Sequence, residues 1–383
     1  MRLLYVIDSL DQGGAEQSLV DLAPHLANEG VDLTIAVLRP GGMLEARARS
    51  AKAKIVHVQP TDRRRQRVER LQDVIDELRP ELVHTTLFEA DIAGRLAATR
   101  RSVPVVSSVV NLAYTSDHRR APGLKPHRVV LAQVADIGTA RLVRRFHTNA
   151  ASLVTPMSRR LLVPRRRFEV IPRGRDDEVL GTRSERRRAD TRFSLELDDH
   201  VPVVLAAARH EYQKGLDVLL DATALIRRSH PNVMVLLAGR DGNRTAALRY
   251  QATRLGLDGN VRFIGARDDV PDLLVAADVF VLPSRWEGLP GAVIEAIALE
   301  TPVVATDLPG VREVLGSELL RGTVVPIGDA QALARRISAT VEDPAAAASW
   351  TTAARARFLR RFTTRRIASE MVDFYARALD TSA

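Results

Sequence analysis

The sequence of 383 residues contains no cysteine, which excludes disulfide bonds and thiolate metal ligands. It has no run of eighteen apolar residues, so no membrane-spanning helix is expected. Asp8 and Asp11 interrupt the apolar start of the chain, which is not typical of a signal peptide. Aromatic residues make up only 4% of the chain and do not punctuate its arginine clusters, which disfavours a nucleic-acid surface that stacks on bases. We therefore expect a cytoplasmic protein without a nucleic-acid partner.

Lysine is also scarce, since only four of the 56 basic residues are lysines and the rest are arginines. The net charge of +9 lies entirely in residues 1–172, which carry 27 basic and 18 acidic residues, whereas residues 173–383 carry 29 of each. An arginine-rich composition that serves solubility explains this charge. The alternative explanation is attraction of the first half to an anionic surface, either a membrane or a substrate.

Short β-rich runs alternate with helical stretches in the first half of the chain. The expected strands cover residues 2–7, 32–37, 54–58, 81–86, 103–110, 151–155 and 168–171. Helices are expected between them, for example at 14–30 and 63–80, where apolar residues recur at helical spacing. This alternation predicts a parallel sheet that helices cover on both faces.

The same alternation restarts after a polar and charged segment at 170–202, which we interpret as a domain boundary. Strands are expected at 201–208, 232–239, 260–265, 278–284, 301–306 and 322–326. The sequence therefore predicts two doubly wound α/β domains, at 1–172 and 173–365. A last helix at 366–383 presents one apolar face and is expected to pack back on the first domain. Ligands bind beyond the carboxyl ends of the strands in such sheets, so two facing domains would form a binding cleft.

Two glutamates eight residues apart follow the buried strand expected at 278–284. Glu287 lies on the loop after this strand, and Glu295 lies about one turn into the next helix. The start of that helix offers unpaired N–H groups to a phosphate, and carboxylates accept hydrogen bonds from adjacent sugar hydroxyls. Two glutamates alone are also typical of a solvated loop and a charged helix start, so the pair needs support from other motifs.

Two further motifs follow the first strand of each half. Arg209 and Lys214 flank the loop after residues 201–208, and a guanidinium with an ammonium suits a diphosphate, although two solvated cations would look the same. Gly13 and Gly14 open the first helix, so its N–H groups can face an anion. No G-x-G-x-x-G fingerprint follows the first strand, which disfavours a dehydrogenase.

Together these motifs resemble those of the retaining group 1 glycosyltransferases of family four, which have the two-domain GT-B fold. The resemblance covers nearly the whole chain and is strongest from "GRDGNR" at 239–244 to "VREVL" at 311–315. It rests on the spacing of Glu287 and Glu295, on R-x₄-K-G at 209–215 and on the early Gly-Gly. It implies hexose transfer from a nucleotide-diphosphate sugar to a hydroxyl of a lipid-linked, polysaccharide or small-molecule glycoside acceptor, with the first domain on the acceptor side and the second binding the donor.

The resemblance also implies a role for each motif residue. Arg209 and Lys214 would bind the donor diphosphate as it leaves, and Glu295 would bind the ribose. The transferred sugar would contact Glu287 and the backbone of Gly288 and Leu289, the base would lie beside Phe263, and Gly13 and Gly14 would close over the donor. A UDP-sugar is the preferred donor and a GDP-sugar the alternative. No cofactor and no metal ion are expected, in keeping with the lack of any Asp-x-Asp pair in the sequence.

Two departures from the family pattern concern the acceptor side. Many relatives have a histidine after the strand at 103–110, where this chain has Asn111, which cannot take a proton. His118 is close in sequence and is a candidate to replace it, although an exposed loop histidine is the plainer interpretation. The usual Pro-Asn-Gly-Val-Asp hinge is Pro-Arg-Gly-Arg-Asp here, so Arg173 and Arg175 add two cations near the cleft, which favours a charged acceptor.

Other functions stay open at this stage. A nucleotide-sugar epimerase or a phosphorylase could share the fold, but a phosphorylase needs a buried cofactor lysine, and Lys214 already has the diphosphate role. A non-enzymatic basic module that binds anionic polymers would leave Glu287 and Glu295 unexplained. The basic first domain also suggests peripheral contact with the anionic inner face of the cell membrane, although no amphipathic helix rich in aromatic residues occurs.

Overall fold

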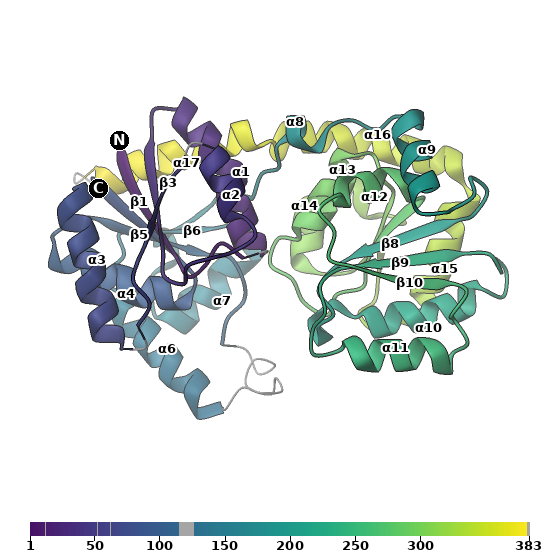
Figure 1. Cartoon of the computed structure of the whole chain (residues 1–383), viewed down its shortest axis with the longest axis horizontal. Coiled ribbons are helices and arrows are strands. Elements are labelled where there is room, and N and C mark those ends of the chain that lie inside the picture. Colours follow the sequence, from purple (N-terminus) through teal and green to yellow (C-terminus); the bar gives the residue numbers. More distant parts are fainter. Residues whose placement is uncertain (12, 52, 62, 115–125, 381–383) are drawn as a thin grey trace. The chain divides into compact units, whose positions relative to one another are not determined.

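The computed structural model describes residues 1–11, 13–51, 53–61, 63–114 and 126–380. The chain divides into two compact units, shown in Figure 1. Unit 1 contains residues 1–174 together with the segment that begins at Thr363, and unit 2 contains residues 175–362. The boundaries expected from the sequence, after 172 and after 365, lie close to these divisions.

Unit 1 is built on a parallel sheet of seven strands in the order β3-β2-β1-β4-β5-β6-β7. The strands are β1 (Arg2–Ile7), β2 (Asp32–Val37), β3 (Lys54–His57), β4 (Leu82–Thr86), β5 (Val105–Val109), β6 (Arg145–Thr148) and β7 (Phe168–Val170). The helices are α1 (Gly14–Asn28), α2 (Glu45–Ser50), α3 (Arg64–Leu78), α4 (Phe88–Arg100), α6 (Pro126–Ala140), α7 (Ala151–Leu161) and α17 (Thr364–Leu379), with a 3₁₀ turn η1 (Arg165–Arg167). Helices α1 and α17 share one core with the sheet, and α3 and α4 share another.

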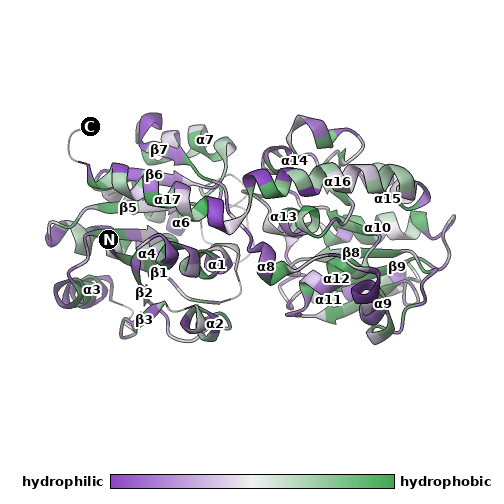
Figure 2. Cartoon of the chain, turned by 90° about the horizontal axis from the view of Figure 1, so that it is seen from above, coloured by the Kyte–Doolittle hydropathy of each residue, from purple (hydrophilic) through white to green (hydrophobic). Residues whose placement is uncertain are grey.

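Unit 2 repeats this plan with six parallel strands in the order β10-β9-β8-β11-β12-β13. The strands are β8 (Val203–Ala207), β9 (Met234–Ala238), β10 (Val261–Gly265), β11 (Val279–Leu282), β12 (Val303–Thr306) and β13 (Val324–Val325). The helices are α8 (Asp177–Leu180), α9 (Glu185–Ser194), α10 (Leu216–Ile226), α11 (Thr245–Arg254), α12 (Val270–Ala276), α13 (Gly291–Ala298), α14 (Pro309–Leu320), α15 (Ala330–Glu342) and α16 (Pro344–Arg361), with a 3₁₀ turn η2 (Tyr212–Lys214). In Figure 2 the apolar strands β8 and β9 are green and the polar outer helix α9 is purple.

Both sheets have the same strand order, which fixes where ligands can bind. The chain starts at a central strand, builds outward on one side, and then returns to build on the other. The direction reverses between β1 and β4 in unit 1 and between β8 and β11 in unit 2. The loops that follow two such strands diverge at the carboxyl edge and leave a crevice for a ligand. The doubly wound α/β architecture expected from the sequence is confirmed.

Helix α17 belongs to unit 1, although the whole of unit 2 precedes it in the sequence. Its buried face carries Ile367, Met371, Phe374 and Tyr375, the residues whose spacing predicted an apolar helix face. They share a core with residues of α1 such as Leu19. No helix within the described ranges is both long enough and apolar enough to cross a lipid bilayer.

One strand prediction was wrong. Residues 151–155 were expected to form a strand because Val154 and Thr155 are β-branched, but they form the first turns of α7. Leu153, Met157 and Leu161 recur at helical spacing and are buried, so burial overrides the local strand propensity. The strand is instead β6, a short run rich in polar residues that the alternation pattern did not reveal.

The charged segment at 170–202 is also more structured than the sequence suggested. It contains α8 and α9, and α9 packs against the rest of unit 2 through its arginines rather than through apolar residues. Arg188 and Arg192 donate to the two carboxylate oxygens of Asp278, at 2.6 and 2.8 Å. Helices α14 and α16 were likewise not expected. The polar composition of residues 170–202 therefore reflects a domain boundary and also helix α9, which ion pairs anchor to Asp278.

Candidate functional site

The loops after β8 and β11 in unit 2 lie side by side, because these strands are neighbours at the point where the strand order reverses. The Arg285 backbone N–H donates to the Gln213 carbonyl at 2.7 Å, and the Gln213 side chain donates to the Trp286 carbonyl at 2.8 Å. Gly215 has a left-handed φ of 62°, and a Cβ atom there would lie 2.0 Å from the Pro283 carbonyl oxygen. The glycine of the R-x₄-K-G motif is therefore required for the two loops to meet.

This contact brings Lys214 and Glu287 together from two motifs 73 residues apart. The Lys214 ammonium lies 2.7 Å from Glu287 Oε1, and the Ser284 hydroxyl donates to the same oxygen at 2.8 Å. Both side chains of the ion pair are largely buried. Arg209 is exposed at the start of the same loop, and its side chain has no hydrogen-bond or ion-pair partner within the described ranges. The site thus combines one fixed cation with one exposed cation.

A second ion pair, which the sequence did not suggest, braces these loops. Arg285 donates to both carboxylate oxygens of Asp217, at 2.9 and 2.6 Å, and its guanidinium lies 4.0 Å from the centre of the Tyr212 ring. Burial alone would raise the pKa of Asp217, but the hydrogen bonds and charge of Arg285 outweigh it and hold this pKa below its usual value. The ion pair therefore links the start of α10, next to Lys214, to the loop that carries Glu287.

Glu295 lies on α13 and is held by Arg175. The Arg175 Nε–H donates to Glu295 Oε1 at 2.5 Å, and both side chains are mostly buried. Arg175 was expected, with Arg173, to add a cation near the cleft, and in the structure its guanidinium pairs with Glu295 inside unit 2. The two residues are 120 positions apart, and no local pattern links them.

The other residues expected to bind the donor have well-defined surroundings. Leu289 is buried, and a Cβ on Gly310 would lie 1.6 Å from the Gly288 carbonyl oxygen, so the Gly-Leu-Pro-Gly loop packs closely on the start of α14. The Phe263 ring, partly buried in the middle of β10, has the Arg249 guanidinium 4.7 Å from its centre. The edge of His210 packs on it at 5.6 Å between ring centres. The expected base-binding wall therefore includes a cation and an imidazole.

The candidates in unit 1 are less closely grouped. Gly13 is the N-cap residue of α1, Gly14 begins the helix, and Arg173 donates to the Gly14 carbonyl at 3.4 Å. Asn111 is exposed in a bend after β5. His118 lies outside the described residues. No group of three or more histidine, aspartate or glutamate side chains that could hold a metal ion occurs in the part of the chain that the structure describes.

Two protein-family models match separate halves of the chain. The model described as Glycosyltransferase Family 4 matches residues 12–179, and the model described as Glycosyl transferases group 1 matches residues 187–357. The two matches lie almost entirely within units 1 and 2 respectively.

Individual relatives agree with these matches. The chain is 38% identical over 152 residues to the lipopolysaccharide core biosynthesis glycosyltransferase LpsE of Rhizobium meliloti, covering 40% of this chain and 43% of that protein. It is 29% identical over 315 residues to the D-inositol 3-phosphate glycosyltransferase of Salinispora tropica, covering 78% of this chain and 64% of that protein. The matched segments thus span less than two thirds of either relative.

A solved structure shows the same fold over nearly the whole chain. The Anabaena protein Alr3699/HepE, crystallised with UDP and glucose, superposes with a TM-score of 0.85 at 23% sequence identity, and the match covers 98% of this chain and 99% of that one. This likeness confirms the GT-B fold class that the sequence predicted. With both family models and the fold in agreement, the chain belongs to the group 1 glycosyltransferases.

Proposed function

We propose that the protein transfers a hexose from a nucleotide-diphosphate sugar, a UDP-sugar by preference, to an acceptor hydroxyl with retention of the anomeric configuration. The observation that carries this proposal is the contact between Lys214 and Glu287 where the strand order of unit 2 reverses, beside the exposed Arg209. A cation pair and a fixed carboxylate at this edge suit a diphosphate joined to a sugar.

Among the described residues, each glutamate of the E-x₇-E motif is held through one oxygen only. Lys214 and Ser284 both donate to Oε1 of Glu287, and Arg175 donates to Oε1 of Glu295. In each carboxylate the second oxygen is left to accept a hydroxyl of the donor. Glu287 then takes a hydroxyl of the transferred sugar and Glu295 a ribose hydroxyl, while the backbone of Gly288 and Leu289 contacts the sugar.

The chemistry follows from the charges at this edge. The bond between the anomeric carbon and the diphosphate oxygen breaks, and its electron pair stays on the diphosphate. Arg209 and Lys214 stabilise the developing negative charge, with the N-terminus of α13 beside them. The acceptor hydroxyl forms the new bond from the same face and gives its proton to the leaving phosphate. Asn111 therefore does not need to act as a base.

Known proteins support the choice of donor and acceptor classes. HepE was crystallised with UDP and with UDP-glucose, which favours a UDP-sugar here. The relatives are named for lipopolysaccharide core biosynthesis and for D-inositol 3-phosphate, so we propose a glycolipid, glycan or phosphorylated polyol as acceptor.

Peripheral contact with an anionic membrane is part of the proposal. Residues 126–167 of unit 1 contain nine arginines and one acidic residue, Asp136, which is buried against Arg95. Helix α6 exposes Val130, Leu131 and Val134 within this basic segment. Exposed apolar side chains among arginines suit anionic lipid, because the arginines bind headgroups while the apolar residues enter the interface.

Vesicle co-sedimentation tests this contact. Binding to vesicles of phosphatidylglycerol and phosphatidylcholine should weaken with salt and should fall several-fold in the Leu131→Ser/Val134→Ser variant. The matched control is Phe193→Ser, which removes an exposed apolar residue of unit 2. Equal vesicle binding by both variants would contradict the contact.

The function itself is tested with a panel of UDP- and GDP-sugars. We expect calorimetric binding of UDP and slow release of free sugar from one UDP-sugar, both reduced in Lys214→Ala. Conversion of the donor into its epimer, without sugar release, would indicate an epimerase of the same fold. Absence of nucleotide binding would leave the basic binding module as the function.

A further inference from the structure

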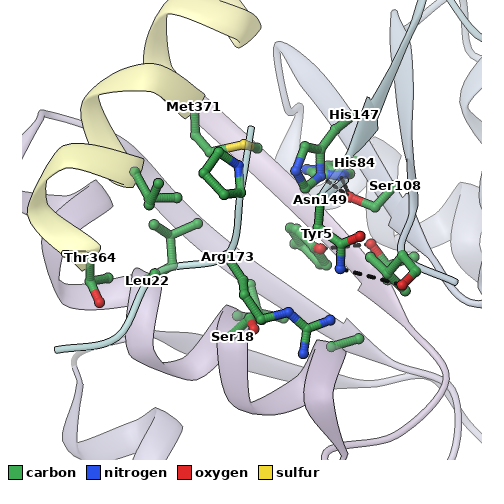
Figure 3. A pocket seen from close by; sticks show the side chains of 17 residues that line it. Tyr5, Ser18, Leu22, His84, Ser108, His147, Asn149, Arg173, Thr364 and Met371 are labelled. Carbon is green, nitrogen blue, oxygen red and sulfur yellow. Dashed lines mark hydrogen bonds between the residues drawn. The ribbon is translucent and has the colours of Figure 1, made fainter. Parts of the chain in front are cut away.

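Unit 1 contains a cavity bounded by α1, α17 and the carboxyl ends of three neighbouring strands (Figure 3). Val110 follows β5, Asn149 follows β6, and the segment 172–174 follows β7, so these groups meet at the edge of the sheet where doubly wound folds bind ligands. The cavity has a free volume of about 50 Å³. That volume admits water or the hydroxyl-bearing end of a ligand, but not a whole sugar ring.

A line of four hydrogen bonds forms one wall of the cavity. It runs from the Tyr375 hydroxyl to His84 Nδ1 at 2.8 Å and from His84 Nε2 to the Ser108 hydroxyl at 2.7 Å. It continues from that hydroxyl to His147 Nδ1 at 2.7 Å and ends at the Ile171 carbonyl, 2.8 Å from His147 Nε2.

The carbonyl at the end of the line fixes the direction of every bond. A carbonyl only accepts, so His147 donates from Nε2, and as a neutral ring it accepts at Nδ1 from Ser108. Ser108 then has to accept from His84 Nε2, and His84 accepts at Nδ1 from Tyr375. Burial lowers the pKa of both histidines, His147 to about 4, in keeping with neutral rings. All four ring nitrogens are committed, so this wall holds no base for the acceptor.

Beside this line of hydrogen bonds, the Asn149 side chain has an unfilled hydrogen-bonding position. Its Nδ2 donates to the Val110 carbonyl at 3.3 Å, which fixes the orientation of the amide, because the reverse orientation would set two acceptors against each other. Only 3% of the residue is exposed, so Oδ1 is buried. This oxygen accepts a hydrogen bond from no donor within the described residues. Arg173 lies across the cavity from this amide in Figure 3 and supplies N–H donors.

These groups select one chemical class of ligand. A hydroxyl can donate to Asn149 Oδ1 and accept from the Arg173 guanidinium at the same time. A bare anion would place oxygen against the amide oxygen, and a cation would be repelled by Arg173. Leu22 and Met371 close the other side and suit the C–H face of a polyol.

We propose that this cavity recognises a non-reacting hydroxyl of a sugar or cyclitol acceptor, and that Asn149 Oδ1 accepts the hydrogen bond from this hydroxyl. The inference rests on the proposed function, because it assigns the hydroxyl to the acceptor of that reaction. The hydroxyl is not the reacting one, since a cavity of about 50 Å³ has no room for the sugar diphosphate that the reacting hydroxyl has to meet.

The test uses the full chain, saturated with UDP, and four probes: methyl glucoside, methyl galactoside, methyl mannoside and myo-inositol. Binding is measured by calorimetry, and the tightest probe is then compared with its deoxy analogues. In the wild type we expect one analogue to bind about tenfold more weakly, because it leaves Asn149 Oδ1 without a donor. In Asn149→Ala that difference should disappear while the Kd for UDP is unchanged. Arg173→Gln should weaken the parent probe.

Asn260→Ala is the matched control, because Asn260 is a buried asparagine of unit 2 whose amide donates to two carbonyls. In Asn260→Ala, the same deoxy analogue should still bind about tenfold more weakly than its parent probe. Persistence of the pattern in Asn149→Ala overturns the proposal, as does the failure of all four probes when UDP binds. A lower Tm in Asn149→Ala with an unchanged pattern would show a cavity filled by water only. If neither UDP nor any nucleotide sugar binds, the proposed function itself has failed.

Discussion

At the scale of single residues, Lys214 is the sharpest test of the donor site. Lys214→Ala removes a cation from the leaving diphosphate and one of the two donors that hold Glu287. A charge-assisted contact contributes roughly 1.5–3 kcal/mol, so kcat/KM with the cognate nucleotide sugar should fall about ten- to a few hundred-fold. Lys54→Ala is the control, because Lys54 is an exposed lysine of unit 1 that pairs with Asp32. Similar kinetics for the two variants would mean that the donor site is elsewhere.

Arg175 is predicted to position Glu295 for the ribose. Arg175→Leu leaves Glu295 without its cation, so we expect the Kd for UDP to rise several-fold and the free energy of unfolding to fall by about 1–3 kcal/mol. Arg175→Lys should restore part of the affinity, and Glu295→Gln should weaken UDP binding in a folded protein. Calorimetry with UDP and urea unfolding separate the two effects. Lower stability with an unchanged Kd would indicate a purely structural ion pair.

At the scale of secondary-structure elements, a buried hydrogen bond from Tyr375 ties α17 to His84 of strand β4 in unit 1. Tyr375→Phe removes the donor to His84 Nδ1 and leaves a buried acceptor unpaired, at a cost of about 1–3 kcal/mol. Urea unfolding should show this loss, and hydrogen exchange should rise in α17 and β4. Tyr250→Phe, at an exposed tyrosine of unit 2, is expected to be silent. Unchanged exchange in α17 would contradict the anchoring role.

The neutral histidines also make unit 1 sensitive to acid. Burial lowers the pKa of His147 from 6.5 to about 4, so the unfolded chain binds a proton before the folded one does. The contribution to stability is complete above about pH 6.5 and is lost as the pH falls towards 4, a change of roughly 2–3 kcal/mol. Urea unfolding from pH 8 to 4 should show a smaller fall in His147→Gln than in the wild type. Parallel pH profiles would contradict a neutral, buried His147.

At the scale of the whole molecule, the proposed mechanism takes the positive charge at the leaving group from side chains. If Arg209 and Lys214 supply the charge that a divalent cation would otherwise supply, turnover should survive excess EDTA. The measurement is sugar transfer or donor hydrolysis before and after chelation, with and without added Mg²⁺ or Mn²⁺. Loss of turnover that these ions restore would overturn the metal-independent mechanism.

The sequence predicted the architecture well because long-range order follows from local alternation. Apolar runs between amphipathic helices are sufficient to predict two parallel sheets, and Ile367 and Met371 at helical spacing are sufficient to predict α17. Strand β6 was missed because only Phe146 in it is a large apolar residue. Propensity cannot reveal a strand whose burial is decided by its neighbours.

The sequence identifies candidate site residues one at a time but does not identify the contacts between them. The pairing of Arg175 with Glu295 joins positions far apart in the chain, and the sequence contains no signal for it. A signal did exist for the line through His84 and Ser108, since these are polar residues in strands that are buried at every position. Polar groups at such positions are retained when they bond to one another.

The placement of α17 in unit 1 also affects the order in which the chain folds during synthesis. Unit 2 is one continuous stretch, so it can form as soon as residue 362 has left the ribosome. Unit 1 cannot finish until α17 follows, because Ile367 and Tyr375 complete a core that was begun by β1 and α1. Until then the face of the sheet that α17 covers is exposed to solvent and open to chaperones. The half of the enzyme that is made first is therefore the last to be finished.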